Sequence, residues 1–483
     1  MATFIIGLCI LVVGGALYGW VCERIMGPDD RPTPALAKTD GVDFVPMRTW
    51  KNSLINLLNI AGTGPILGPI QGILFGPVAF IIIPIGCVFG GAIHDYFSGM
   101  LSVRNGGAQM PALVKKFTNA PTHDLYLVFI CLLMPLVGAV FVFTPGDIAA
   151  KQVLELSGSH SAISTWVIYG AIFVYYVIAT LFPIDKIIGR IYPIFGAILL
   201  LSTAGVFAGL FMGGYSLDNL SFSNWRGIHP DGYNLVPIFF ITVACGIVSG
   251  FHSTQTSIIA RSVTHEKQGR MTFFNMMILE GFIAMVWAAA AMAIMNKGVG
   301  SRNATDMVGI ISRDMLGSIG GLMAIFGAIV LPITSGDTAL RGLRLMVAEK
   351  FGIDQKPRAA RLNVSLPIFA IVAAIVVWAK FSQRGFEILW HYFAWCNQTI
   401  AIFAFAIIAI YLLGRGHRWA SLMALIPGAW YAFVTFSFIC NASIGLNIPM
   451  PISYALGALF ALGYAAVVYR HGCRNNGQLT MDN

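Results

Sequence analysis

Long apolar runs separated by short polar connections recur from one end of the chain to the other. A membrane-spanning helix needs about 20 apolar residues, so windows of about 19 residues that end at charge clusters locate candidate spans. Thirteen such spans lie near residues 4–22, 53–72, 77–102, 125–146, 163–183, 191–214, 234–250, 272–296, 318–335, 366–380, 390–413, 419–441 and 448–469. The pattern therefore predicts an all-α polytopic membrane protein of about thirteen transmembrane helices.

The composition excludes an ordinary soluble protein. Of the 483 residues, 57% are hydrophobic and 11% are charged, whereas a soluble domain has roughly 25% charged residues. The net charge of +9 is spread over the connections rather than gathered on one compact face, so it predicts no nucleic-acid partner. Membrane lipid is the expected surrounding of the chain.

The basic residues are divided unequally between alternate connections. With an outside N-terminus, the inner connections hold 23 of the 30 lysines and arginines, and the outer connections hold seven. The positive-inside rule then predicts an outside N-terminus, a cytoplasmic C-terminus and an odd number of spans. The first apolar run, Phe4 to Val21, has no basic residue before it and no cleavage pattern after it, so we expect a retained helix rather than a signal peptide.

Residues that often mark chemistry are absent or scattered. The eight cysteines stand singly, nearly all in apolar runs, with no CxxC pair and no ligand-like grouping with histidine. The lack of HExxH, GxSxG and GK[ST] motifs disfavours an embedded enzyme and an ATP-driven pump. The sequence thus predicts no enzyme, no metal site and no cofactor other than a coupling ion, H⁺ or Na⁺.

The second predicted span contains a segment that cannot form a continuous helix. Residues 62–72 include four glycines and two prolines. Proline removes a backbone donor, and each glycine costs about 1 kcal/mol relative to alanine. Irregular backbone at membrane depth is tolerated only where protein or a watery cavity covers it. We therefore interpret this segment as substrate-binding, with a kinked or re-entrant packing element as the alternative, and the candidate residues are Gly62, Thr63, Gly64, Pro65 and Gly68.

A second interruption lies in the seventh predicted span, from Cys245 to Ser257, where glycines lead into a polar run. At such breaks, half-helix N-termini offer amides to an anionic group, and unwound carbonyls can hold a cation. A small molecule that bears a carboxylate is therefore a plausible substrate. The candidate substrate-binding residues here are Ser249, Gly250, His252, Ser253, Thr254 and Gln255.

The two interrupted spans are five spans apart. A repeat with an odd number of spans inserts in opposite orientations, which is the inverted-repeat arrangement of secondary transporters with discontinuous helices. We predict a first five-helix repeat at 53–215 and a second at 234–413. Residues 1–52, with one helix and a basic loop, and residues 414–483, with two helices and a tail, are peripheral.

Ionisable residues inside the spans are candidate coupling sites. His94 and Asp95 lie about two turns from the inner end of the third span, and Glu280 lies near the middle of the eighth. An acid at membrane depth costs a few kcal/mol unless it is paired or hydrated, so a role in proton coupling is a hypothesis for each. The alternatives are a structural His–Asp hydrogen bond and, for Glu280, partnership with a buried base.

The ninth span adds hydroxyl and charged side chains. Thr334 and Ser335 can ligate Na⁺ together with carbonyls of a broken helix, although hydroxyls that bond back to their own helix are commoner. Asp337 and Arg341 are four residues apart and can pair on one helix face. Such a pair fits a gate and a simple anchor equally well.

The eleventh span carries amides that are too polar to face lipid. Asn397 and Gln398, with the neighbouring Trp395, are predicted to line a helix interface or the transport path and to contact substrate. The aromatic residues at the start of this span fit an interfacial belt as well as a substrate gate.

Five segments in this order resemble the carbon starvation protein A (CstA) family of bacterial inner-membrane transporters, in a short form. They are IAGTGPILGP (60–69), GAIHDY (91–96), SGFHSTQ (249–255), TSGDTA (334–339) and YFAWCNQT (392–399). The resemblance implies uptake of small carbon sources during starvation, with peptides the usual proposal and pyruvate assigned to close relatives. It also implies an inverted-repeat fold similar to that of amino-acid transporters.

The leading functional hypothesis is a cation-coupled symporter that works by alternating access. Protons would use Asp95 or Glu280, and Na⁺ would use Thr334 and Ser335. A passive channel or facilitator is an alternative, although no ring-forming filter repeat is present. A membrane nutrient sensor that signals through the basic loop Arg341 to Arg361 is another. The sequence leaves the substrate and the oligomeric state open.

Overall fold

The computed structural model of the chain describes residues 1–41, 43–154, 163–181, 185–227, 229–355 and 357–474. Within these ranges every regular element is a helix and no strand forms, which confirms the predicted all-α class. The end of the predicted span 163–183 and the C-terminal tail from 475 onward lie outside the described residues.

Most predicted spans appear as continuous or nearly continuous helices. They are α1 (Ala2–Cys9) with α2 (Gly15–Met26), α6 (Ala79–Gly86) with α7 (Ala92–Arg104), α9 (Ala120–Ile148), α10 (Ile163–Leu181), α11 (Asp185–Met212), α14 (Asn275–Asn296), α15 (Ala304–Phe351), α16 (Arg358–Phe381), α17 (Gly385–Gly414), α18 (Arg418–Asn441) and α19 (Met450–Arg474). Two short helices, α3 (Pro34–Ala37) and α8 (Met110–Phe117), lie in connections.

The predicted count of thirteen spans is not confirmed. Among the described residues, ten helices are long and apolar enough to cross a membrane, or eleven when the bent pair Thr49–Ala61 and Gly64–Phe75 is counted as one span. The apolar part of α10, Ile163–Ala179, is shorter, and the seventh predicted span is divided into two short pieces. Length alone therefore does not identify a crossing that a break divides.

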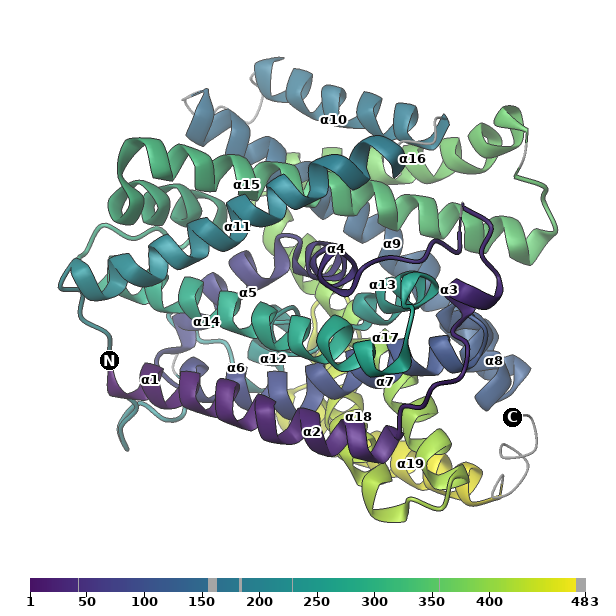
Figure 1. Cartoon of the computed structure of the whole chain (residues 1–483). Helices are drawn as coiled ribbons and strands as arrows, with labels where there is room; N and C mark the ends of the chain where they lie inside the picture. The colour runs from purple at the N-terminus through teal and green to yellow at the C-terminus, as the bar shows by residue number, and fades with distance from the viewer. Residues whose placement is uncertain (42, 155–162, 182–184, 228, 356, 475–483) are drawn as a thin grey trace.

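Several long helices, α11, α14 and α15 among them, run roughly along one direction, whereas α4 is seen nearly end-on, and α1 begins at the end of the bundle opposite to the one where α19 ends (Figure 1). We call these ends the N-terminal face and the C-terminal face. Helices α10, α11, α15 and α16 lie on one side, and α2, α18 and α19 lie on the other (Figure 1). The most apolar window of the helix that contains α14 is 83% buried, against 22% for α19, so α14 is central and α19 is peripheral.

The first interrupted span consists of α4 (Thr49–Ala61) and α5 (Gly64–Gly72), whose axes are bent by 46°. Gly62 stands at the bend with φ of +22°, a conformation that side chains rarely adopt. Pro65 follows in the first turn of α5, where a missing backbone donor costs little. The predicted glycine–proline break is therefore present, and it is short.

The second interrupted span consists of α12 (Phe240–Thr242) and α13 (Gly250–Ile259). The seven residues between them are not regular helix, and Gly246 has φ of +90°. A break is present here too, and it is longer than the first, but it lies at residues 243–249. The predicted interruption ran to Ser257, whereas the helix resumes at Gly250, so the polar run belongs to α13. Both breaks lie in the interior of the bundle, because Gly62, Thr63 and residues 243–249 are buried.

Candidate functional site

The two breaks pack against each other. A Cβ atom added to Gly64 would lie 2.3 Å from Sγ of Cys245, and one added to Gly68 would lie 3.1 Å from the carbonyl oxygen of Thr242. The start of α5 therefore rests directly on the irregular backbone of the second span. Since glycines have no side chain, they permit this close approach of two backbones. The sequence-predicted segments around Gly62 and Ser249 are thus neighbours in space.

Helix α17 holds the second break through three side chains. Asn397 accepts a hydrogen bond through Oδ1 from the second backbone amide of α13, at 2.7 Å. Gln398 donates through Nε2 to the first carbonyl of α12 at 3.0 Å, and Trp390 donates through Nε1 to its last carbonyl at 3.1 Å. These bonds satisfy backbone groups that a break leaves without intrahelical partners. Asn397 and Gln398, predicted to bind substrate, therefore support the irregular backbone.

Trp395 lies elsewhere. Its indole Nε1 donates to the carbonyl oxygen of Thr435 on α18 at 3.0 Å, and its ring contacts Phe129 of α9. It lines a groove on the outer surface of the bundle. The structure does not bring Trp395 together with the two breaks.

Four buried ionisable side chains lie in a row beside the second break. His252 of α13 lies between two carboxylates: its Nδ1 is 3.0 Å from Asp95 Oδ2, and its Nε2 is 3.6 Å from Glu280 Oε2. Asp95 Oδ1 also lies 2.8 Å from Nδ1 of His94. The four residues come from α7, α13 and α14, and each is 0% exposed. The structure thus joins three residues predicted as coupling sites to one predicted to bind substrate.

The charge balance of these four side chains requires bound protons. Two carboxylates with two neutral imidazoles carry two negative charges, and an uncompensated buried charge costs several kcal/mol. Neutrality therefore needs two protons shared among His94, Asp95, His252 and Glu280. Among the described residues, neither oxygen of Glu280 nor Nε2 of His252 has a hydrogen-bond partner within 3.5 Å, so a proton can shift between these two side chains. The alternatives weighed for His94 and Glu280, a His–Asp hydrogen bond and a buried base as partner, both describe the geometry.

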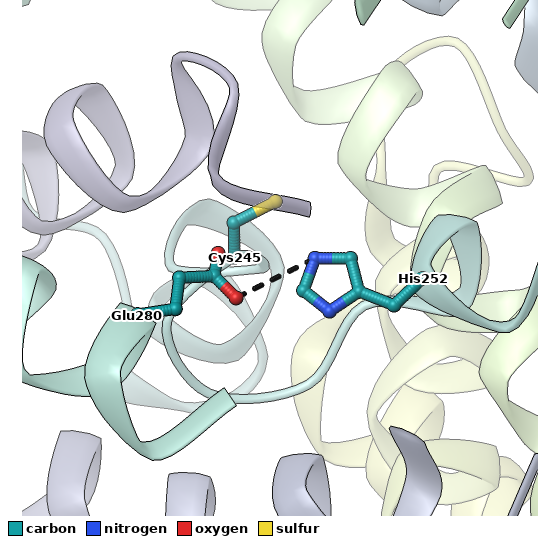
Figure 2. Close-up of side chains that lie close together, drawn as sticks. All are labelled: Cys245, His252 and Glu280. Atoms are coloured by element: carbon teal, nitrogen blue, oxygen red, sulfur yellow. Dashed lines mark ion pairs between the residues drawn. The ribbon is translucent and has the colours of Figure 1, made fainter. Parts of the chain in front are cut away.

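Cys245 lies beside the same pair. Figure 2 shows its side chain next to the facing side chains of Glu280 and His252, and the ligand atoms of the three lie within 4.8 Å of one another. Thiolate, imidazole and carboxylate are ligands that zinc takes, so this grouping is a possible metal site that the sequence did not reveal. Its members come from the break, α13 and α14, and no fixed spacing announces them. A metal ion here would displace the proton between His252 and Glu280.

The hydroxyls predicted for Na⁺ behave differently from each other. Thr334 donates to the carbonyl oxygen of Leu331 on its own helix at 2.8 Å, the commoner outcome for such a residue. The hydroxyl of Ser335 points to the carbonyl oxygen of Leu58 on α4 at 3.5 Å. Ser335 therefore links α15 to the first broken helix, close to Gly62.

The pair on α15 forms as its spacing predicts. Arg341 Nη2 lies 3.1 Å from Asp337 Oδ2, and Arg341 also approaches the carbonyl oxygen of Ala179 on α10 at 3.5 Å. The pair joins two helices and lies apart from the row of ionisable side chains around His252. This arrangement fits the anchoring interpretation at least as well as the gating one.

The hydroxyls of α13 mostly bond to their own helix. Ser253 donates to the carbonyl oxygen of Gly250, and Thr254 to that of Phe251. Gln255 donates through Nε2 to the Thr254 hydroxyl, while its Oε1 has no hydrogen-bond partner in the part of the chain that the structure describes. Thr254 and Gln255 line a cavity of about 20 Å³ on the C-terminal side of the breaks.

A larger cavity of about 340 Å³ leads from the N-terminal face toward the breaks. Its inner lining includes Gln71 after the first break and Thr242 before the second, and its walls carry several ion pairs. Lys380 and Asp147, each 7% exposed, lie 2.7 Å apart, and Tyr169 donates to Asp147 at 2.6 Å. Sequence reasoning placed Lys380 among ordinary connection charges, because a partner on another helix gives no local signal.

The same cavity is bordered by a second polar cluster. Arg384 pairs with Glu387 at 2.6 Å, and Tyr233 donates its hydroxyl to Glu387. His391 also lines the cavity, and its ring lies against that of Tyr233. The cations of this cavity are thus held by acids, which leaves its walls polar with little net charge.

The C-terminal face is tied together by a buried ion pair. Arg104 at the end of α7 binds Glu266 through two hydrogen bonds of 3.0 and 2.8 Å and also donates to the Tyr411 hydroxyl. Arg104 also donates to the carbonyl oxygen of Gly27, at the start of the loop after α2. In this loop the guanidinium of Arg31 hydrogen-bonds Asp29 and keeps the pKa of that carboxyl below its usual value. Bidentate, charge-assisted bonds of this kind are among the stronger polar contacts, so Arg104 and Glu266 hold the ends of several helices together at this face.

Comparison with known proteins gives a consistent picture. A family model described as carbon starvation protein CstA matches residues 1–153, 146–309 and 302–438. An uncharacterized membrane protein of Haemophilus influenzae is 41% identical in an alignment that covers 61% of this chain and 91% of that protein. The peptide transporter CstA of Escherichia coli is 24% identical over 89% of this chain and 79% of its own length.

Two further proteins extend the comparison. The pyruvate/proton symporter BtsT of Escherichia coli is 24% identical over 57% of this chain and 46% of its own length. A crystal structure of the manganese transporter of Eremococcus coleocola matches with a TM-score of 0.55 over 90% of this chain and 98% of its own, at 10% identity. The likeness to that structure concerns the fold alone. The family model and the two named transporters support a multi-pass membrane protein with a transport role rather than an enzyme.

Proposed function

Because the chain belongs to the carbon starvation protein CstA family, we propose that it takes up small carboxylate-bearing carbon sources during starvation, in symport with protons. Peptides and pyruvate are the substrates that the names of its relatives suggest. The proposed site of action is the bacterial inner membrane, with the N-terminus outside and the C-terminus in the cytoplasm.

The observation that supports proton coupling is the row of three buried ionisable side chains, Asp95, His252 and Glu280. Its proton acceptors face each other at 3.0 and 3.6 Å on three different helices. The ionisable groups that face it are His94, on the same helix as Asp95, and the thiols of Cys245 and Cys87. Since α13 starts at the break, a movement of that half-helix changes the distance from His252 to both carboxylates. A proton can thereby be bound in one conformation and released in the other.

The two cavities support alternating access. The cavity of about 340 Å³ reaches the breaks from the N-terminal face, while the cavity that Thr254 and Gln255 line beyond them has about 20 Å³. Substrate would enter through the larger cavity and bind where the two broken helices cross. Rotation of the α13 half-helix would then enlarge the smaller cavity toward the cytoplasm.

Uptake into proteoliposomes tests the proposal. The purified full chain is reconstituted, and entry of labelled pyruvate and of a labelled dipeptide is followed with and without an inward proton gradient and an inward Na⁺ gradient. We expect accumulation that needs the proton gradient. Uptake that depends on neither gradient would contradict symport and indicate a passive facilitator. If neither compound enters, a sensor would be favoured.

Glu280→Gln separates coupling from substrate binding. The amide keeps the shape of the side chain but cannot carry the proton, so gradient-driven accumulation is expected to fall at least about tenfold, while exchange of labelled for unlabelled substrate persists. Asp218→Asn, an exposed acid at the N-terminal face, is the matched control and is expected to leave accumulation unchanged. If chelator treatment of the wild type removes its accumulation, the cluster holds a metal ion and not a proton.

Sodium coupling is a second candidate, favoured by one observation. The hydroxyl of Ser335 approaches the carbonyl oxygen of Leu58 beside the first break, which is an oxygen pair of the type that binds Na⁺. Ser335→Ala would then abolish Na⁺-driven uptake. The control variant Ser98→Ala, which removes a buried hydroxyl on α7, would leave Na⁺-driven uptake unchanged.

A further inference from the structure

A groove runs along the outer surface of the bundle between α9, α17, α18 and α19. It encloses about 480 Å³, and its walls are almost entirely apolar, with Phe403, Ala406 and Phe436 among them. Leu125 and Val467 on its rim are 51% and 67% exposed. In a chain that spans a membrane, this groove opens to the hydrocarbon of the bilayer rather than to water.

One end of the groove is polar. Thr118, Asn119 and His471 line it there, at the C-terminal face. The His471 ring donates through Nε2 to the carbonyl oxygen of Phe117 at 3.1 Å. This bond brings the end of α19 against the end of α8, so the groove passes from apolar walls to a polar mouth over its own length.

Exposed basic residues flank the polar end of the groove, close in sequence to its lining residues Thr118 and His471. The last turn of α8 carries Lys115 and Lys116, the end of α19 carries Arg470 and Arg474, and all four are exposed. The nearby acid, Asp124, forms an ion pair with Lys350 at 2.8 Å. The excess positive charge therefore lies where an apolar groove meets the membrane surface.

We propose that this groove binds one anionic phospholipid, with an acyl chain between α9 and α19 and the phosphate among the lysines and arginines at the C-terminal face. Apolar walls with a basic mouth match an acyl chain with a negative headgroup, and basic pockets between membrane helices bind such headgroups. A neutral phospholipid matches the walls but not the mouth.

The position of the lipid connects it to the second break. Trp395 and Thr399 form part of the groove wall, and Asn397, two residues after Trp395, caps α13. A filled groove supports the segment of α17 that holds the break, whereas an empty groove leaves the Trp395 indole without packing on one side. The bound lipid thus stabilises the arrangement of α17 and α13.

Native mass spectrometry of the purified full chain tests binding. The protein in detergent is mixed with phosphatidylglycerol or with phosphatidylcholine of the same chain length, and retained adducts are counted. We expect one tightly retained phosphatidylglycerol and a rise in the thermal unfolding midpoint that phosphatidylcholine does not produce.

Two variants locate the site. Lys115→Ala with Lys116→Ala removes two charges, each expected to contribute about fivefold to affinity, so the specific adduct weakens by at least tenfold while the unfolding midpoint without lipid stays the same. Ala406→Phe fills the groove and is expected to prevent the adduct without changing any charge. The matched control, Arg24→Ala with Lys267→Ala, removes two cations of α2 and of residues 266–268 and is expected to bind like the wild type.

Two outcomes would overturn the proposal. Equal retention of both lipids, unaffected by the lysine variant, would make the groove a general acyl-chain contact. A dimer mass without lipid adducts would show that a second copy of the chain covers this face. Neither result depends on whether the protein transports protons.

Discussion

The two broken helices look alike in the sequence but are held by different means. The first, at Gly62, has no ionisable residue between Asn52 and Val78, and its break is fixed by backbone conformation and close packing. The second, between α12 and α13, is held by hydrogen bonds from α17 and flanked by His252 and its two carboxylates. The comparison indicates a division of roles, in which one break lets backbones approach and the other carries the charge chemistry.

This difference follows from the lengths of the breaks. A break of two residues leaves few unpaired backbone groups, so glycine and proline suffice. Seven irregular residues leave more, and at membrane depth each must find a partner in the protein. Asn397, Gln398 and Trp390 are those partners. The longer break is therefore dependent on side chains of another helix and is more sensitive to their loss.

The largest expected difference concerns His252. Replacing it with alanine leaves Glu280 and Asp95 buried without the imidazole between them, and breaking a buried pair costs about 3–5 kcal/mol. Thr63→Ala at the first break removes a hydroxyl that has no hydrogen-bond partner among the described residues, so a loss below about 1 kcal/mol is expected. Thermal unfolding of both purified variants measures the difference. Equal losses would mean that the second break is not held by charge.

A smaller effect is expected where the breaks touch. Gly64→Ala places a Cβ 2.3 Å from Cys245, and such overpacking costs about 1–3 kcal/mol. Cys245→Gly in the same chain removes the clashing atoms and is expected to restore part of the loss. Gly342→Ala, where the added Cβ meets nothing within 4 Å, is the matched control. If the double variant is no more stable than Gly64→Ala alone, the two breaks are not in contact.

A loss smaller than those of His252→Ala and Gly64→Ala is expected from the cap of α13. Asn397→Ala removes the acceptor of the second α13 amide, and the loss of such a cap costs about 1 kcal/mol. The variant is expected to weaken substrate exchange more than this loss of stability implies, because α13 also carries His252. Asn275→Ala, whose amide makes only a weak contact with Met271, serves as the control in the same exchange assay. A similar decrease in both variants would argue against a role of the cap.

Sequence reasoning predicted the breaks well and their partners poorly. Glycine and proline act locally, so interruptions within residues 62–72 and 245–257 can be predicted without knowledge of the fold. Asn397 and Gln398 were recognised as too polar for lipid, but their contacts with α12 and α13 depend on how helices about 150 residues apart pack. The same limit explains why Lys380 was counted as a connection charge although it pairs with Asp147.

The span count shows a related limit. Ten described helices, or eleven with the bent pair, have the length and composition of a crossing, against thirteen predicted. Hydropathy averages over a window and does not register a helix that stops after Thr242 and starts again at Gly250. The five-plus-five repeat, its boundaries and the orientation in the membrane stay predictions.

By itself, the sequence determined that this protein lives in a membrane as a helical bundle, that two of its spans are interrupted, and which family it resembles. These properties depend on apolar run length, on glycine and proline, and on local motifs. Only the tertiary structure decided that His252 lies between Asp95 and Glu280, that Cys245 joins them, and that Trp395 faces a groove at the surface. Such placements come from the packing of distant helices, and the energy of a buried charge depends on its neighbours in space rather than on its neighbours in the chain.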